Sequence, residues 1–163
     1  MRTAQLFTED IVHPITSFCL SNDGASTIAA SCLDGIIRLW GCSSSLANDN
    51  IRKKPVFKKL HSSHKSNNYK VECTFTSNDE YVVSGSECGD IAIYPVNLDG
   101  SGSSNNNEDA SNEATILKRH KGPTTSVAAC PQTKRPWLIV SASYDGTAVA
   151  WASQAQYDCC LLD

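Results

Sequence analysis

The feature that most constrains the fold is a unit that occurs three times along the chain. Each copy has an apolar run, a polar turn, a second apolar run, a glycine turn, and a third run that ends in an aromatic residue. The copies are Ile15–Trp40, Val71–Tyr94 and Thr125–Trp151, and their turn glycines lie 54 and 57 residues apart. Self-similarity at a period of tens of residues indicates stacked supersecondary units, so the chain is expected to be a repeat protein.

Each unit reads as three short antiparallel strands. Asp34-Gly35, Cys88-Gly89 and Asp145-Gly146 supply the positive φ that tight hairpins need. In the first unit, the run Ile36–Trp40 is apolar at nearly every position, as in a strand that is buried on both faces. Helical periodicity is absent, so the fold class is all-β, with sheets stacked face to face.

The connecting segments contain a fourth strand for each unit. Gln5–Thr8, Val56–Leu60 and Ala114–Leu117 have the required apolar and β-branched content, and the lysines in the second of these suit an outer edge. Between them lie a Ser/Asn-rich linker, 41–50, and a low-complexity stretch, 97–112, that is too polar to bury. We expect the second stretch to be a surface insertion.

The composition excludes some classes of protein. The 163 residues are 40% hydrophobic, carry a formal net charge of −3 and contain no long apolar run, so neither a membrane span nor a broad nucleic-acid surface is expected. The eight cysteines form no Cys-x-x-Cys pair, and no apolar leader follows Met1. Reduced thiols in a cytoplasmic and/or nuclear protein are the favoured interpretation, and a disulfide scaffold is the alternative.

The third unit carries a motif that resembles the WD-repeat β-propellers. The residues are His120, Ser141, Ser143, Asp145, Gly146 and Trp151, echoed by His64, Ser84 and Tyr94 in the second unit and by Asp34, Gly35 and Trp40 in the first. Within that family, Gln5–Phe7, Pro14–Thr16 and His64–Cys73 are similar to the C-terminal half of the mitogen-activated protein kinase organizer type of scaffold.

The resemblance implies a partial propeller of about three four-stranded antiparallel blades. Because propellers use about four to eight blades, three units predict a ring that is not closed. The expected divisions are 1–11 as an outer strand of a missing blade, 12–60 as blade one with its linker, 61–117 as blade two with the insertion 97–113, 118–152 as blade three without its outer strand, and 153–163 as a tail.

The resemblance also implies a buried hydrogen-bond network in each blade. In blade three, His120 would bond Ser141 and Asp145, with the indole N–H of Trp151 as the last donor. The equivalent positions elsewhere are partly replaced: the partial networks are His64 with Ser84, and Asp34 with Trp40, while Ala30 and Cys88 depart from the pattern. We therefore expect blades one and two to be less rigid.

The expected function is a non-catalytic scaffold for protein–protein interaction. By resemblance, its partners would be kinase-cascade components or pre-mRNA splicing factors, and the open ring would allow self-association. An RNA-binding propeller and a substrate receptor of a ubiquitin ligase are the alternatives. A hydrolase triad is the least favoured interpretation, because Ser141 would lie inside a strand without oxyanion donors.

Two further sequence features have competing interpretations. No cofactor or metal is expected, because the pair His61 and His64 lacks further ligands of the usual spacing. Arg52–Lys54 with the following lysines is either a nuclear-import or kinase-docking signal, or simply a solvated loop and edge strand, and the second interpretation is favoured.

Overall fold

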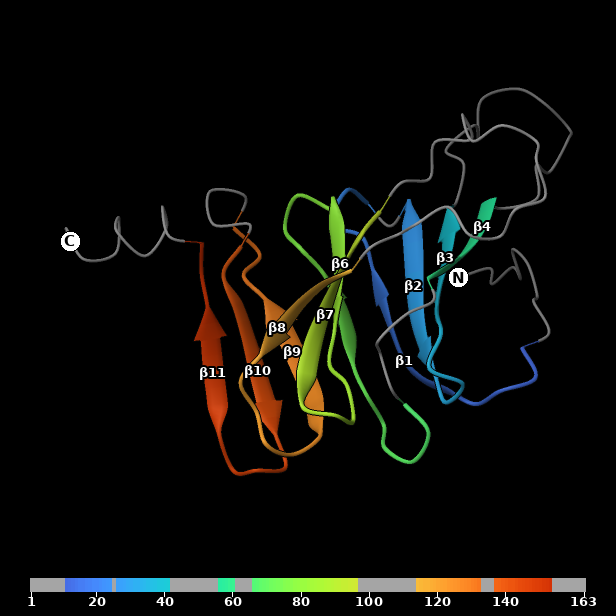
Figure 1. Cartoon of the computed structure of the whole chain (residues 1–163). Helices are drawn as coiled ribbons and strands as arrows, with labels where there is room; N and C mark the ends of the chain where they lie inside the picture. The colour runs from blue at the N-terminus through green and yellow to red at the C-terminus, as the bar shows by residue number, and fades with distance from the viewer. Residues whose placement is uncertain are drawn as a thin grey trace, which may run out of the picture.

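The chain folds into three antiparallel β-sheets that lie side by side (Figure 1). The computed structural model describes residues 11–24, 26–41, 56–60, 66–96, 114–132 and 137–153. Every regular element in these ranges is a strand, which confirms the all-β prediction and the open array of blades. In the described residues, no helix has the length and apolar character needed to cross a membrane.

The first sheet has four strands in sequence order. They are β1 (Ile15–Leu20), β2 (Thr27–Cys32), β3 (Ile37–Gly41) and β4 (Val56–Leu60). Ile37, Arg38, Leu39 and Trp40 are all buried, as the sequence predicted for a strand between two layers. Burial of the guanidinium is compatible with this because Arg38 pairs with Asp34 at 2.5 Å.

The second sheet repeats this order, and the third has three strands within the described residues. The second contains β5 (Cys73–Phe75), β6 (Tyr81–Ser84), β7 (Asp90–Pro95) and β8 (Thr115–Lys118). The third contains β9 (Thr124–Ala129), β10 (Ile139–Ser143) and β11 (Ala148–Trp151). In each sheet the third strand ends on or beside the aromatic residue of the repeat, namely Trp40, Tyr94 and Trp151.

Two apolar clusters join the sheets. The first packs Ala29, Leu39 and Leu60 of the first sheet against Phe75 and Tyr94 of the second. The second cluster joins the second and third sheets through Val83, Ile91, Ile93, Val127 and Ile139. The core is therefore a series of face-to-face interfaces between sheets, as expected for stacked blades.

The turn glycines adopt the predicted backbone conformation. Gly35, Gly89 and Gly146 have φ values of 72°, 88° and 81°, a region that other residues enter only with strain. Several predicted features lie outside the described residues: the strand Gln5–Thr8, the linker 42–50, the histidines His61 and His64, the insertion 97–113 and the tail beyond 153.

Candidate functional site

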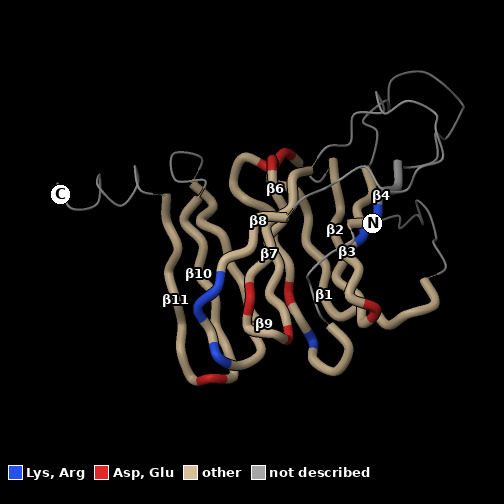
Figure 2. The backbone as a smooth tube through the Cα atoms, in the orientation of Figure 1, with Lys and Arg blue, Asp and Glu red and all other residues tan. Residues whose placement is uncertain are grey.

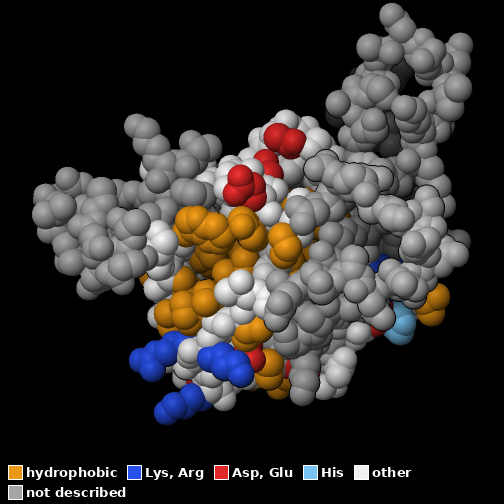
Figure 3. Space-filling model, turned by 45° about the horizontal axis from the view of Figure 1, so that its top comes forward, with side chains coloured by type: hydrophobic (Ala, Val, Ile, Leu, Met, Phe, Trp, Pro, Cys, Tyr) orange, Lys and Arg blue, Asp and Glu red, His pale blue; other side chains and the backbone are white. Residues whose placement is uncertain are grey.

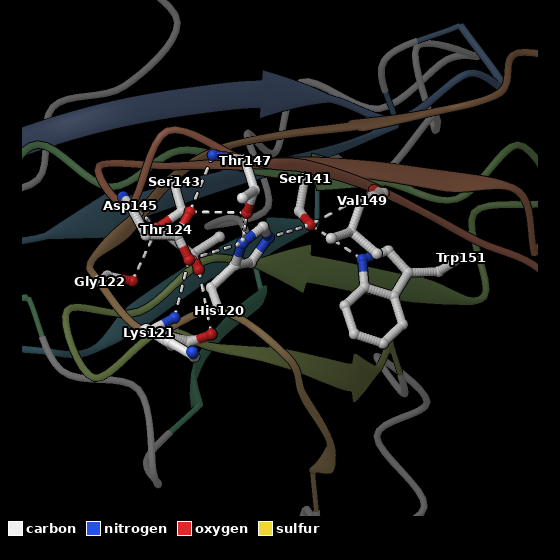
Figure 4. A network of polar contacts seen from close by, with 11 residues as sticks. His120, Lys121, Gly122, Thr124, Ser141, Ser143, Asp145, Thr147, Val149 and Trp151 are labelled. Atoms are coloured by element: carbon white, nitrogen blue, oxygen red, sulfur yellow. Dashed lines mark hydrogen bonds and ion pairs between the residues drawn. The ribbon is translucent and has the colours of Figure 1, made fainter.

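A polar network fills the interior of the third sheet at the predicted positions (Figure 4). His120 precedes β9, Ser141 lies on β10 and Trp151 ends β11. His120 Nε2 is 2.8 Å from Ser141 Oγ, and the indole N–H of Trp151 donates to the same oxygen at 2.9 Å. Ser141 is 1% exposed, so its hydroxyl joins the sheet internally and is out of reach of a substrate in solvent.

The structure differs from the predicted network at Asp145. The closest partner of His120 Nδ1 is Thr147 Oγ1 at 2.9 Å, while Asp145 Oδ2 lies at 3.5 Å. Thr147 Oγ1 in turn donates to Asp145 Oδ1 at 2.6 Å. The threonine thus mediates between the histidine and the carboxylate, a role that the motif did not reveal.

One placement of protons satisfies the whole network. The Trp151 indole donates to Ser141, Ser141 donates to His120 Nε2, the Nδ1–H of His120 donates to Thr147, and Thr147 donates to Asp145. This assigns the Nδ1–H tautomer to the histidine, next to the carboxylate that favours it. Every donor points toward the negative charge, an order that strengthens each hydrogen bond in the chain.

Asp145 also holds the turn segments together. Its carboxylate accepts the backbone N–H of Lys121 at 2.8 Å and that of Thr147 at 2.9 Å. The Thr147 hydroxyl and these two N–H groups lower the pKa of Asp145 below its usual value. The carboxylate therefore anchors the segment before β9 to the β10–β11 turn.

The second sheet replaces this carboxylate by a thiol. Cys88 Sγ lies 3.1 Å from Ser86 Oγ and 3.4 Å from Asp90 Oδ2. Ser84 is buried, and its hydroxyl reaches the carbonyl oxygen of Glu72 at 3.4 Å. Its predicted partner, His64, lies outside the described residues.

In the first sheet, Asp34 has a different partner from its counterpart in the third sheet. Arg38 donates to both carboxylate oxygens, and the Ile36 N–H donates to Oδ1 at 3.0 Å. Burial opposes ionisation of Asp34, but these hydrogen bonds outweigh it and its pKa is lowered. Trp40 is buried nearby on β3, and Ala30 stands at the serine position. Of the predicted site residues, the four that lie close together in one network are those of the third sheet: His120, Ser141, Asp145 and Trp151.

Close backbone contacts fix the second sheet against the third. A Cβ on Gly85 would lie 2.2 Å from the carbonyl oxygen of Thr124. Thr124 also donates its N–H to Ser86 O at 2.9 Å and its hydroxyl to Gly89 O at 3.1 Å. The glycines therefore admit the neighbouring strand at backbone contact distance, so these two sheets pack closely at this point.

An exposed aromatic pair lies at the edge of the sheets that carries the glycine turns. Tyr144 is 70% exposed and packs edge-to-face on Tyr69, with ring centroids 5.3 Å apart. Both residues are held by their backbones: Tyr144 N–H donates to Pro123 O, and Tyr69 N–H donates to Glu87 Oε1. We call this surface, formed by Tyr69, Lys70, Lys121 and Tyr144, the tyrosine edge.

Glu87 shapes the loop that carries Tyr69. Its Oε1 accepts three consecutive backbone N–H groups, those of residues 67, 68 and 69, at 2.5, 2.5 and 2.8 Å. Burial raises the pKa of this carboxyl, but the N–H donors have the larger combined effect and the pKa is lowered. No cluster of three or more metal-binding side chains occurs among the residues that the structure describes.

The antiparallel sheets pack face to face, and each has the same glycine turn. This arrangement is that of a partial, open β-propeller. Residues 6–41 and 111–152 match the family model for the WD domain, G-beta repeat. Together with the fold, these matches support the WD-repeat family, whose members are generally non-catalytic interaction modules.

One curated relative is the human WD repeat domain-containing protein 83. It is 35% identical to this chain over 96 residues. The match covers 59% of this chain and 27% of the relative, so the chain corresponds to a limited part of that protein's length. The second unit, which lacks the motif carboxylate, lies largely between the two stretches that match the family model.

Proposed function

We propose that this chain is a docking platform that uses the tyrosine edge to bind protein partners. The WD-repeat matches support a role in protein interaction. For the class of partner, the sequence resemblance favours components of a mitogen-activated protein kinase cascade or pre-mRNA splicing factors, and hence a cytoplasmic or nuclear location.

The observation that carries the proposal is the exposed tyrosine pair, whose rings pack against each other. Aromatic side chains at the centres of interfaces supply much of the binding energy, because they bury a large area and lose little conformational entropy. Tyr144 is already fixed by its ring contact with Tyr69 and by the backbone hydrogen bond to Pro123. Binding there would cost little further ordering.

The charge distribution favours a protein partner over RNA. In Figure 2, both acidic and basic residues lie along the lower edge of the three sheets. In Figure 3, an apolar band separates a small group of basic side chains from the acidic ones, so on the visible surface the basic side chains are confined to one edge. A single-strand RNA site would instead combine a continuous basic track with stacking aromatics.

Binding of purified kinase-cascade and splicing components to the full chain tests the proposal. Tyr144→Ser should weaken binding of the true partner by about tenfold or more, as expected for an aromatic anchor. Val12→Ser is the matched control, because Val12 is 94% exposed but belongs to neither the tyrosine edge nor the self-association faces. Equal loss in both variants would contradict the proposed surface.

RNA is tested with an unstructured oligonucleotide under the same conditions. The proposal predicts weak binding that Tyr144→Ser leaves unchanged. Tight binding that falls steeply with salt and is lost in a Lys70→Ala, Lys121→Ala variant would establish the RNA interpretation instead.

Self-association is the second candidate, and the outer faces of the end sheets favour it. Cys19 faces the second sheet, so the neighbouring Phe18 and Leu20 point away from it, and both are exposed. On the third sheet, Val127 and Ile139 face inward while Val140 is exposed on the other side. Apolar side chains are therefore exposed on the outer faces of both end sheets.

We infer that the occupant of these faces is another blade, which a second copy of the chain provides. Sedimentation velocity should show concentration-dependent association that Phe18→Ser abolishes and Tyr144→Ser does not. A compact monomer at all concentrations would contradict this part of the proposal while leaving the docking test intact.

A further inference from the structure

Two cysteines meet across the interface between the first and second sheets. Cys19 lies on β1 and Cys73 on β5, and their sulfur atoms are 3.8 Å apart. A disulfide bond is ~2.05 Å long, so the two sulfurs need to approach by less than 2 Å for a bond to form. The two segments already pack together, since Thr16 Oγ1 on β1 reaches the carbonyl oxygen of Val71, two residues before β5, at 3.3 Å.

The two thiols are unequal. Cys19 is partly exposed, and a hydrogen bond from Cys73 lowers the pKa of its thiol. Cys73 is buried, and its hydrogen bond to Cys19 together with its burial raises the pKa of its thiol well above the usual value. Cys19 is therefore the thiol that a reagent can reach as a thiolate, with Cys73 poised behind it.

Two other described cysteines, Cys32 and Cys88, lack this arrangement. Cys32 is fully buried, and its burial raises the pKa of its thiol. Cys88 is exposed, and its described contacts are with Ser86 and Asp90. A partly exposed thiol with a second thiol at contact distance occurs at Cys19 and Cys73.

We propose that Cys19 and Cys73 form a peroxide-responsive dithiol site that, when oxidised, links the first sheet covalently to the second. The oxidant is a hydroperoxide such as hydrogen peroxide. This site is independent of the tyrosine edge, and it goes beyond the docking function by allowing the platform to be stiffened under oxidising conditions.

The chemistry balances in two steps. The Cys19 thiolate attacks one peroxide oxygen, the O–O bond breaks, and the leaving hydroxide takes up a proton to become water, which leaves Cys19 as a sulfenic acid. Cys73 then attacks the Cys19 sulfur, the S–O bond breaks, and the hydroxide that leaves combines with the Cys73 proton as a second water. Overall, the two thiols lose two electrons to form the disulfide, and one hydrogen peroxide molecule gains them to form two waters.

Linkage mapping of the full chain tests the site. The reduced, folded protein is treated with hydrogen peroxide, remaining thiols are alkylated, and the digested peptides are sequenced by mass spectrometry. The expected product is a Cys19–Cys73 cross-link, about 2 Da lighter than the reduced pair, in the wild type and in the control variant Cys88→Ser. A different dominant pairing, such as Cys19 with Cys32, or no cross-link at all, would overturn the proposal.

The order of the steps has its own readout. In Cys73→Ser, the sulfenic acid on Cys19 cannot be resolved, so dimedone should label Cys19. In Cys19→Ser, Cys73 should remain a thiol and take no dimedone. Labelling of Cys73 in that variant would contradict the assigned roles.

A measurement on the wild type covers the case in which either variant misfolds. Oxidation in the folded state should give the Cys19–Cys73 pair selectively, whereas oxidation in urea should give mixed pairings. The oxidised folded protein should also melt about 5–15 °C higher than the reduced protein, because the link closes a long loop. Equal pairing patterns with and without urea, or an unchanged melting temperature, would refute the site.

Discussion

Two buried serines allow a matched test of the network in the third sheet, because the same substitution should have opposite effects. Ser141 is 1% exposed and joins Trp151 to His120, whereas Ser31 is 0% exposed and its hydroxyl has no hydrogen-bond partner among the described residues. Ser→Ala removes one oxygen in each case and changes little in shape. The difference between the two variants therefore isolates the hydrogen bonds.

The magnitudes follow from the contacts. Ser141→Ala leaves His120 Nε2 and the Trp151 N–H without their partner, and a buried unsatisfied polar group costs about 1–3 kcal/mol. Because Trp151 is partly exposed, its N–H regains some water, so we expect a total loss of about 2–4 kcal/mol in the free energy of unfolding. Ser31→Ala removes a buried hydroxyl that has no partner among the described residues, and should stabilise the fold by about 1 kcal/mol.

Urea unfolding at neutral pH under reducing conditions, followed by tryptophan fluorescence, measures both values. With a slope of about 2 kcal/mol/M, Ser141→Ala should lower the midpoint by about 1–2 M and Ser31→Ala should raise it slightly. Equal midpoints for the two variants would refute the account of the network, since burial alone would then decide the effect.

The remaining predictions concern pH, packing and a turn. The pKa of Asp145 is lowered in the folded state, so its contribution to stability is present above the pKa of an unfolded aspartate, ~3.9, and is lost progressively as pH falls below that value. Asp145→Asn should therefore flatten the dependence of the urea midpoint on pH between about pH 2 and 5. Gly85→Ala should lower the free energy of unfolding by about 2 kcal/mol or more, because the new methyl group meets the Thr124 carbonyl oxygen. Gly146→Ala has open space around it and should lower the free energy of unfolding by about 1 kcal/mol, from its positive φ alone. Urea midpoints distinguish the two variants. Asp79 accepts two backbone N–H groups from the β1–β2 turn of the neighbouring sheet, so Asp79→Ala should speed hydrogen exchange at residues 22 and 23, and unchanged exchange there would contradict this role.

Local sequence signals predicted the strands and their turns. The glycine positions fixed three hairpins because a positive φ is required by the turn itself, independently of the rest of the chain. The buried run at Ile37–Trp40 was readable for a similar reason, since a strand between two layers has no polar face. The fourth strand of the second sheet begins one residue later than expected, at Thr115, because its limits depend on pairing with β7.

Local sequence signals could not predict contacts between residues that are far apart in the sequence. Thr147 lies between His120 and Asp145, and the motif does not specify the residue after the glycine. The sulfur contact of Cys19 and Cys73 joins residues 54 positions apart, and it depends on how two sheets pack. Side-chain partners across sheets are set by tertiary packing, which a single sequence does not encode in its local pattern.

Hydrogen–deuterium exchange of the chain, with and without a bound protein partner, tests the docking platform most directly. The account predicts that binding slows exchange at 66–70, 119–123 and 144–147, the segments that form the tyrosine edge and its supports. Slowed exchange confined to β1 and β10, with the tyrosine edge unaffected, would contradict it.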